Sequence, residues 1–224
     1  MRALGALALS FMALVAQAPP PEDHRAQPRE AAVFLTDVPA HVGSVILARP
    51  TATTLTVSLL WHAGAEGLLV WAPAGAPLPT QGRRVSLKPG EPTSTVIEGL
   101  KPDTAYTYEL RDPATGKRLL PVEGPGAFHT ARARGQAFTF TLQADSHLDG
   151  SCLPDLYQRM LTNARADAPD FHLDLGDTFM TEKHGSRDSA ARQYAAQRYH
   201  LGQLGQVAPL FLVLGNHDGE TLDR

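Results

Sequence analysis

The sequence contains almost no cysteine, and this scarcity excludes one common route to stability. Cys152 is the single cysteine among 224 residues, so no disulfide can form within the chain. The fold must therefore be held together by its packed cores alone. Cys152 lies where a helix is expected to begin, just before Pro154, and we interpret it as a structural thiol rather than a nucleophile.

A strong charge of either sign is also missing. The chain has 20 Lys and Arg against 23 Asp and Glu, a formal net charge of -3. Nucleic-acid polymers are bound chiefly through basic surfaces, so polymer binding is disfavoured, while a nucleotide substrate stays open. The 43% hydrophobic and 19% charged content is ordinary for a folded protein and argues against disorder throughout.

No apolar run is long enough to span a bilayer comfortably, since a helix needs about 20 residues to do so. The run from Ala3 to Ala16 follows Arg2 and leads into Ala16-Gln17-Ala18, which has the small-x-small form of a signal-peptidase site. We predict a signal peptide over residues 1–18 and export to the periplasm or the medium, with no membrane span remaining. A buried N-terminal helix is the alternative. Residues 19–30, rich in proline at their start, are expected to form a linker.

Residues 31–130 show short alternating or β-branched runs separated by Gly/Pro turns. This spacing predicts a β-sandwich. The expected strands are Thr53–Trp61, Gly67–Trp71, Arg83–Leu87, Thr95–Ile97, Tyr106–Arg111 and Ala127–Thr130.

One segment of this region has a recognisable pattern. Leu100 to Tyr106 reads L-K-P-D-T-A-Y and resembles the fibronectin type III signature L-x-P-x-T-x-Y, which precedes the sixth strand of that fold. The resemblance implies a fibronectin III-like domain over 31–130. It also implies a tyrosine corner, in which the Tyr106 hydroxyl bonds the backbone a few residues upstream. Trp71 is then interpreted as the core tryptophan.

Residues 136–224 change to an α/β pattern in which strands and helices alternate. Such an order implies parallel strands that are buried on both faces. The expected elements are strand Phe138–Leu142, helix Pro154–Arg165, strand Phe171–Leu175, helix Ser189–Leu204 and strand Leu210–Leu214.

Three short polar motifs each follow one of these three strands. Ligands of open α/β sheets bind at the carboxyl ends of strands, so the motifs are expected to converge. They are Asp145-Ser146-His147, Gly176-Asp177 and Gly215-Asn216-His217-Asp218.

The residue types suit a binuclear metal centre. Asp145 and His147, two apart on an extended segment, would project the same way and bind one ion. The two oxygens of Asp177 can bridge two ions, and Gly176 lets the backbone approach that crowded point. Asn216 can give an amide oxygen to the second ion.

The last motif also carries a candidate proton donor. His217 would lie beside the metals, suited to stabilise charge or to protonate a leaving oxygen. Asp218 could orient its ring. His172 and Asp174, on one face of the second strand, are interpreted either as support behind Asp177 or as a buried pair with no part in chemistry.

With these motifs, residues 136–224 resemble a calcineurin-like metallophosphoesterase, and the preceding domain makes the layout similar to purple acid phosphatases. The resemblance implies an αββα sandwich and two transition-metal ions, Fe, Mn or Zn. It implies a metal-bridged hydroxide that attacks a small-molecule phosphate ester. Asp145 and His147 would hold the first metal, Asp177 would bridge, and Asn216 would hold the second. His217 would be the acid, supported by Asp218.

The sequence departs from that family in two ways. Purple acid phosphatases have a metal-binding tyrosine three residues after the bridging aspartate; here Met180 stands there, which disfavours a purple ferric site. The later G-H-x-H motif of the family is absent, so we expect only the N-terminal part of the metallophosphoesterase domain. The alternatives are a truncated, inert chain whose β-sandwich is a binding module, and a single-metal hydrolase of other esters. Substrate and oligomeric state stay open.

Overall fold

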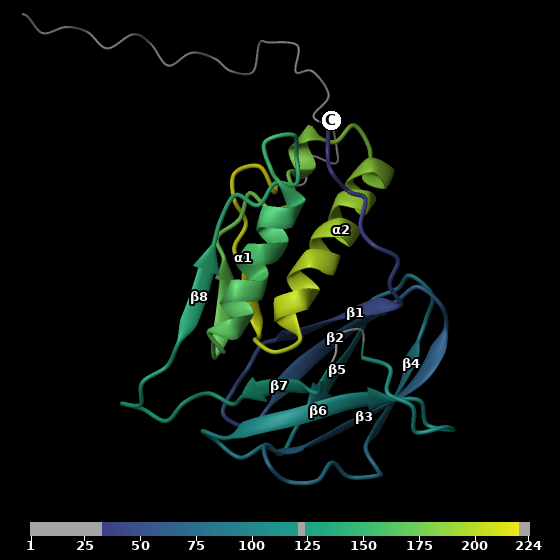
Figure 1. Cartoon of the computed structure of the whole chain (residues 1–224), viewed down its shortest axis with the longest axis vertical. Coiled ribbons are helices and arrows are strands. Elements are labelled where there is room, and N and C mark those ends of the chain that lie inside the picture. Colours follow the sequence, from purple (N-terminus) through teal and green to yellow (C-terminus); the bar gives the residue numbers. More distant parts are fainter. Residues whose placement is uncertain (1–32, 121–123, 220–224) are drawn as a thin grey trace, which may run out of the picture. The chain divides into compact units, whose positions relative to one another are not determined.

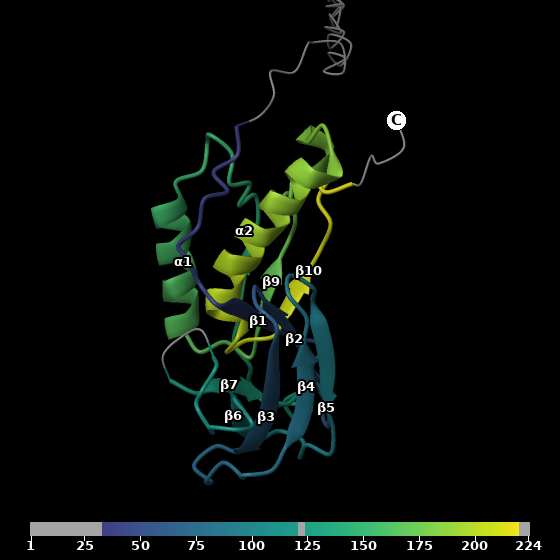
Figure 2. The same ribbon diagram turned by 90° about the vertical axis from the view of Figure 1, so that its right-hand side faces the viewer.

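Two antiparallel sheets stack to form the first part of the structure, and a parallel α/β layer follows (Figures 1 and 2). This computed structural model describes residues 33–120 and 124–219, and these residues pack as one unit. The predicted signal peptide, 1–18, and the predicted linker, 19–30, lie outside the described residues.

The sandwich confirms the predicted β architecture. One sheet has the order β1-β2-β5 and the other β4-β3-β6-β7, with every pair antiparallel. The strands are β1 (Gly43–Ala48), β2 (Leu55–Trp61), β3 (Ala65–Pro73), β4 (Arg83–Leu87), β5 (Thr93–Ile97), β6 (Ala105–Arg111) and β7 (Gly126–His129). Strand β1 was not predicted, because its apolar residues form a continuous run without alternation.

The tyrosine corner is present as predicted. The hydroxyl of the buried Tyr106 accepts a hydrogen bond of 2.8 Å from the backbone N–H of Lys101, five residues upstream. The prediction for Trp71 was wrong, since its side chain is only partly buried. Trp61 is the core tryptophan instead, because it continues the inward-facing positions 55, 57 and 59 of β2.

The α/β part has the predicted order of elements, and its three strands pair in parallel as β10-β9-β8. Pro154 begins α1 at a position where its missing N–H costs nothing, and Ser186 caps α2 through a capping box with Ser189. The elements are β8 (Phe140–Gln143), α1 (Pro154–Ala166), β9 (Phe171–Asp174), a 3₁₀ turn (Thr181–Lys183), α2 (Arg187–Gly205) and β10 (Leu210–Leu212).

Only one face of this parallel sheet is covered by the described part of the chain, so the prediction of burial on both faces was wrong. The buried Gln143 of β8 contacts Tyr157 of α1 on the helix side. The opposite face is apolar and open: Phe140 is 44% exposed and Leu142 56% exposed. Further exposed apolar side chains in and beside these strands are Phe138, Phe211, Leu212, Val213 and Leu214.

Polar side chains join α2 to the sandwich. Arg198 donates to the Ser44 hydroxyl at 2.9 Å and to the Ser58 carbonyl at 3.1 Å, and burial lowers its pKa to about 10. The fully buried Tyr108 donates to the Gln206 carbonyl at 2.8 Å. Helix α2 is therefore fixed against the sandwich, and it carries the side chains that hold the loops described next. No helix within the described ranges is long and apolar enough to cross a membrane.

Candidate metal centre

The loops that leave β8, β9 and β10 meet at the carboxyl edge of the parallel sheet. The backbone N–H of Asp145 donates to the Gly176 carbonyl at 3.0 Å, which joins the first loop to the second. The N–H of His217 donates to Oδ1 of Asp177 at 2.9 Å, which joins the third loop to the second. The structure thus brings the three predicted motifs together.

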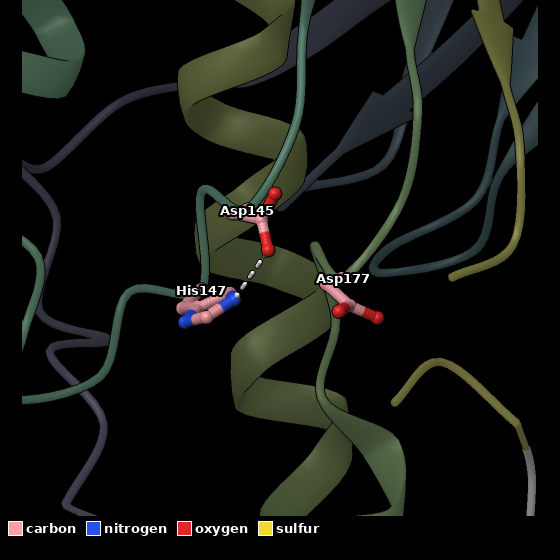
Figure 3. Close-up of side chains that lie close together, drawn as sticks. All are labelled: Asp145, His147 and Asp177. Carbon is pink, nitrogen blue, oxygen red and sulfur yellow. Dashed lines mark ion pairs between the residues drawn. The ribbon is translucent and has the colours of Figure 1, made fainter. Parts of the chain in front are cut away.

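Asp145, His147 and Asp177 form a compact group of possible metal ligands (Figure 3). One ligand atom from each lies within 4.8 Å of the others. Nε2 of His147 is buried and has no hydrogen-bond partner, and Oδ1 of Asp145 is 3.5 Å away. An orphaned imidazole nitrogen facing carboxylates fits a transition metal, because imidazole and carboxylate together suit Fe, Mn and Zn.

A further carboxylate lies behind His147. Oδ2 of Asp149 is 3.7 Å from Nδ1 of His147, on the other side of the ring from Asp145. Histidines that bind metals commonly have such a carboxylate at their second nitrogen, which sets the tautomer and the ring orientation. The sequence analysis did not select Asp149, although the D-x-H-x-D spacing of Asp145, His147 and Asp149 could have indicated it.

The backbone of this centre is not extended, contrary to the expectation for Asp145 and His147. Asp145 has φ 58°, His147 φ 26° and Asp177 φ 53°, all in the left-handed region. Among the described non-glycine residues, five of the eight with positive φ lie in these loops, Leu148 and Met180 being the other two. Such conformations cost about 1–3 kcal/mol each and gather where function requires a fixed geometry.

Two glycines allow the loops to cross closely. A Cβ on Gly176, whose φ is 99°, would overlap the backbone of Gly215, and a Cβ on Gly215 would overlap the backbone and carboxylate of Asp177. The predicted role of Gly176 at a crowded point agrees with this contact. Asn216, the predicted ligand of a second ion, is exposed and follows the crossing point directly.

His217 pairs with a residue that sequence reasoning did not find. Its Nδ1 is 2.5 Å from Oε1 of Glu182, and the backbone N–H of Glu182 donates to the His217 carbonyl at 3.4 Å. Glu182 lies in the 3₁₀ turn, where no spacing relative to a motif marks it. The expectation that Asp218 orients the His217 ring is replaced by this contact.

Asp218 instead binds backbone amides of two loops. Its Oδ1 accepts from the N–H groups of Thr178, Phe179 and Met180 at 3.0, 2.7 and 3.2 Å, and its Oδ2 accepts from Gly215 at 3.0 Å. Burial on its own would raise the pKa of Asp218, but these N–H groups outweigh burial and lower it. The 3% exposed side chain therefore fixes the loop after Asp177 against the loop that carries His217.

Asp174 supports the same loop from β9. Its carboxylate accepts from the N–H of Gly176 at 3.0 Å, the hydroxyl of Thr178 at 2.6 Å and the amide of Gln143 at 2.7 Å. Of the two interpretations of Asp174, the structure thus favours support behind Asp177. His172 bonds Thr141 at 2.8 Å and takes no part in this network.

Helix α2 adds two buried glutamines that the sequence interpretation overlooked. Gln193 donates to the carbonyls of His147 and Thr178, and Gln197 donates to the Thr178 carbonyl at 2.7 Å and the Ser146 hydroxyl at 3.2 Å. Both are 0% exposed. Their signal was an i, i+4 pair of amides on the buried face of a helix, where apolar residues are the norm.

Comparison with known proteins gives a structural likeness only. No protein-family model matches the chain, and no curated protein matches it. Among solved structures, it is similar to PhoD, with a TM-score of 0.51, 14% identity, and coverage of 87% of this chain and 41% of PhoD. The chain thus spans about two fifths of PhoD's length, and at this identity the likeness concerns the fold.

Smaller structures are similar to less than half of the chain. The sensor domain of the anti-sigma factor RsgI4 from Pseudobacteroides cellulosolvens has a TM-score of 0.33 and 17% identity, and covers 43% of this chain and 100% of its own. The FN3 domain of human collagen XX has a TM-score of 0.30 and 23% identity, with coverage of 45% and 100%.

Proposed function

We propose that this protein is a metal-dependent hydrolase of small phosphate esters, with its centre at the carboxyl edge of the parallel sheet. The observation that carries the proposal is the group of Asp145, His147 and Asp177, in which the buried Nε2 of His147 has no hydrogen-bond partner and lies 3.5 Å from Oδ1 of Asp145. The fold shared with PhoD supports it. We also propose that residues 136–224 are part of a metallophosphoesterase domain with an αββα sandwich.

In the proposed site, Asp145, His147 and Asp177 would hold one ion, and Asp177 and Asn216 would hold a second. Two transition-metal ions, Fe, Mn or Zn, would supply an activated water and neutralise charge on the phosphate oxygens. Asp149, whose Oδ2 lies 3.7 Å from Nδ1 of His147, would orient that ring.

His217 is the proposed proton donor to the leaving oxygen. Glu182 accepts the Nδ1 proton of His217, which leaves the Nε2 proton to be given to the ester oxygen. Asp218 keeps the His217 loop in register with Asp177 through four backbone amides. Its proposed part is thus to position the loops rather than to touch the substrate.

Metal content and hydrolysis together test the proposal. We expect about two transition-metal ions per chain by elemental analysis, and metal-dependent hydrolysis of an aryl phosphate mono- or diester. Asp177→Ala should lose both, whereas Asp155→Ala, at an exposed aspartate in the first turn of α1, should lose neither. Metal content and activity that survive in Asp177→Ala would refute the assignment.

The place of action is part of the same proposal. The small-x-small site at Ala16-Gln17-Ala18 supports export, and the substrate would then be a phosphate ester outside the cytoplasm. A nucleic-acid polymer is not a proposed partner, because the net charge of -3 offers no basic surface for it.

A further inference from the structure

Two histidine rings meet where β1 begins and β2 ends, and neither histidine belongs to the motifs of the candidate metal centre. Nε2 of His41 and Nε2 of His62 lie 3.0 Å apart, and the rings are nearly perpendicular, with an interplanar angle of 82°. His41 precedes β1 and His62 follows β2. Neither histidine belongs to a sequence motif.

The pair is held by the backbone of the β1–β2 ladder. Gly43 is opposite Trp61 in the antiparallel register, and the N–H of His62 donates to the Val42 carbonyl at 3.1 Å. Both histidines are therefore anchored within two residues of paired strand ends. Because the ladder orders the nearby backbone, bringing the two imidazoles together costs mainly side-chain conformational entropy.

The tautomer of His41 leaves its Nε2 free to bind a metal. Nδ1 of His41 is 2.9 Å from the Pro39 carbonyl, and since a carbonyl can only accept, Nδ1 carries the proton. The Nε2 lone pair then faces His62. A backbone carbonyl at one ring nitrogen is the arrangement that commonly orients a histidine whose other nitrogen binds a metal.

The distance between the two nitrogens is compatible with adjacent ligand positions on one ion. Two imidazole nitrogens at about 2.0–2.1 Å from a shared ion and 3.0 Å from each other subtend about 90–100°. Such adjacent positions suit the tetragonal geometry of Cu(II) or Ni(II), and Cu(II) binds nitrogen ligands most tightly among the divalent first-row ions.

Space for further ligands lies next to His41. A cavity of about 210 Å³ is lined by His41, Ser44, Tyr199 and Gln203, together with Ala40, Gly43 and Gly202. The Tyr199 ring centroid is 4.7 Å from that of His41. The cavity has room for waters, and its hydroxyl and amide groups can bind them.

We propose that His41 and His62 form a second metal site, which takes a divalent late transition metal, Cu(II) foremost, and which is independent of the phosphoesterase proposal. Without metal, the Nε2–H of His62 donates to Nε2 of His41. When the ion binds, His62 moves its proton to Nδ1, and both Nε2 atoms become ligands. No oxidation or bond cleavage is part of the proposal.

The test uses the whole untagged chain, stripped of metal, with Asp145→Asn and Asp177→Asn introduced to weaken metal binding at the candidate centre. CuCl₂ is titrated by calorimetry, and the Cu(II) electron paramagnetic resonance spectrum is recorded. We expect one tight equivalent, with hyperfine structure from two nitrogens. Either His41→Ala or His62→Ala should weaken binding at least tenfold, because each removes one of the two ligands.

His129→Ala is the matched control. Its Nδ1 also bonds a carbonyl, at 2.6 Å, but its Nε2 faces Asp103 at 3.7 Å rather than a second imidazole. This variant should bind Cu(II) as the parent does, and thermal melts establish that each variant is folded. The proposal is overturned if the parent binds no Cu(II), or if either His41→Ala or His62→Ala binds as tightly as the parent; the pair is then only a hydrogen bond between neutral rings.

Discussion

Asp218→Asn is the substitution that tests most directly how the candidate centre is held together. The side chain is 3% exposed, and its two oxygens accept four backbone N–H bonds from the loops that follow β9 and β10. Asparagine has nearly the same shape, so packing is unchanged. What changes is the charge, and one acceptor oxygen becomes an NH₂ donor.

The expected loss follows from these bonds. Hydrogen bonds to a charged group contribute about 1.5–3 kcal/mol each, and neutral ones about 0.5–1.5 kcal/mol. In Asp218→Asn the amide oxygen can keep the three bonds from Thr178, Phe179 and Met180 in weakened form, but the NH₂ group then faces the N–H of Gly215. Because such terms are not additive, we expect the free energy of unfolding to fall by about 2–4 kcal/mol.

Metal binding should weaken as well, because the substitution loosens the loops that carry Asp177 and His217. Groups that orient metal ligands without touching the metal typically change affinity by about 10–100-fold when replaced. Urea unfolding measures the first effect, and titration of the metal-free protein with Mn(II) or Zn(II) measures the second.

Asp112→Asn is the control for this prediction. Asp112 also accepts two backbone N–H bonds through one oxygen, from Ala114 at 2.9 Å and Thr115 at 2.8 Å, but it lies in an exposed turn of the sandwich. We expect at most about 1 kcal/mol from that change. If Asp218→Asn unfolds at the same urea concentration as Asp112→Asn and keeps the parent's metal affinity, the positioning role of Asp218 is refuted.

Three further predictions concern other parts of the structure. Tyr106→Phe removes the acceptor of the Lys101 N–H and should lower the free energy of unfolding by about 1–2 kcal/mol; an unchanged urea midpoint would contradict the tyrosine corner. Burial lowers the pKa of His200 from 6.5 to about 4, so the unfolded chain takes up the proton first. The free energy of unfolding should therefore fall as the pH drops from 6.5 to about 4, and His200→Gln should remove that part of the pH dependence. If the curves of unfolding free energy against pH run parallel for the parent and His200→Gln, burial of this ring is unimportant. The double variant Phe140→Thr and Leu142→Thr should bind less of an apolar fluorescent dye and should self-associate less. We expect little loss of stability, because both side chains are already exposed. A fall in the free energy of unfolding above about 2 kcal/mol would mean that the open face is packed in solution.

Local patterns in the sequence were enough to predict the sandwich, the order of elements in the α/β part and the meeting of the three motifs. Arg83–Leu87 was predicted with the same bounds as β4, because its alternation and the flanking turns are both local signals. The tyrosine corner was also predictable, since it joins residues only five apart. Three loops at the carboxyl ends of parallel strands must lie at one edge of the sheet, so Asp145, Asp177 and His217 could be placed together without coordinates.

The partners of those side chains were decided by tertiary structure. Glu182 contacts His217 across 35 residues, and Asp218 reaches amides 38 to 40 residues away; neither contact has a sequence period. The positive φ values at Asp145 and His147 depend on loops that bind one another, whereas spacing alone suggested an extended segment. The pairing of His41 with His62 exists only because β1 and β2 are in register.

Burial was the property that sequence patterns predicted least well. The sequence of an apolar strand indicates that its residues favour burial. It does not indicate whether another part of the protein packs against each face of that strand. In the parallel sheet of the described chain, Phe140 and Leu142 point to an open face while Gln143 and Asp174 are buried against the helix side. The sequence alone therefore determined which segments become strands and helices, through local periodicity and turn chemistry. Only the three-dimensional packing decided which faces are covered and which polar groups meet, because those depend on contacts between residues that are distant along the chain.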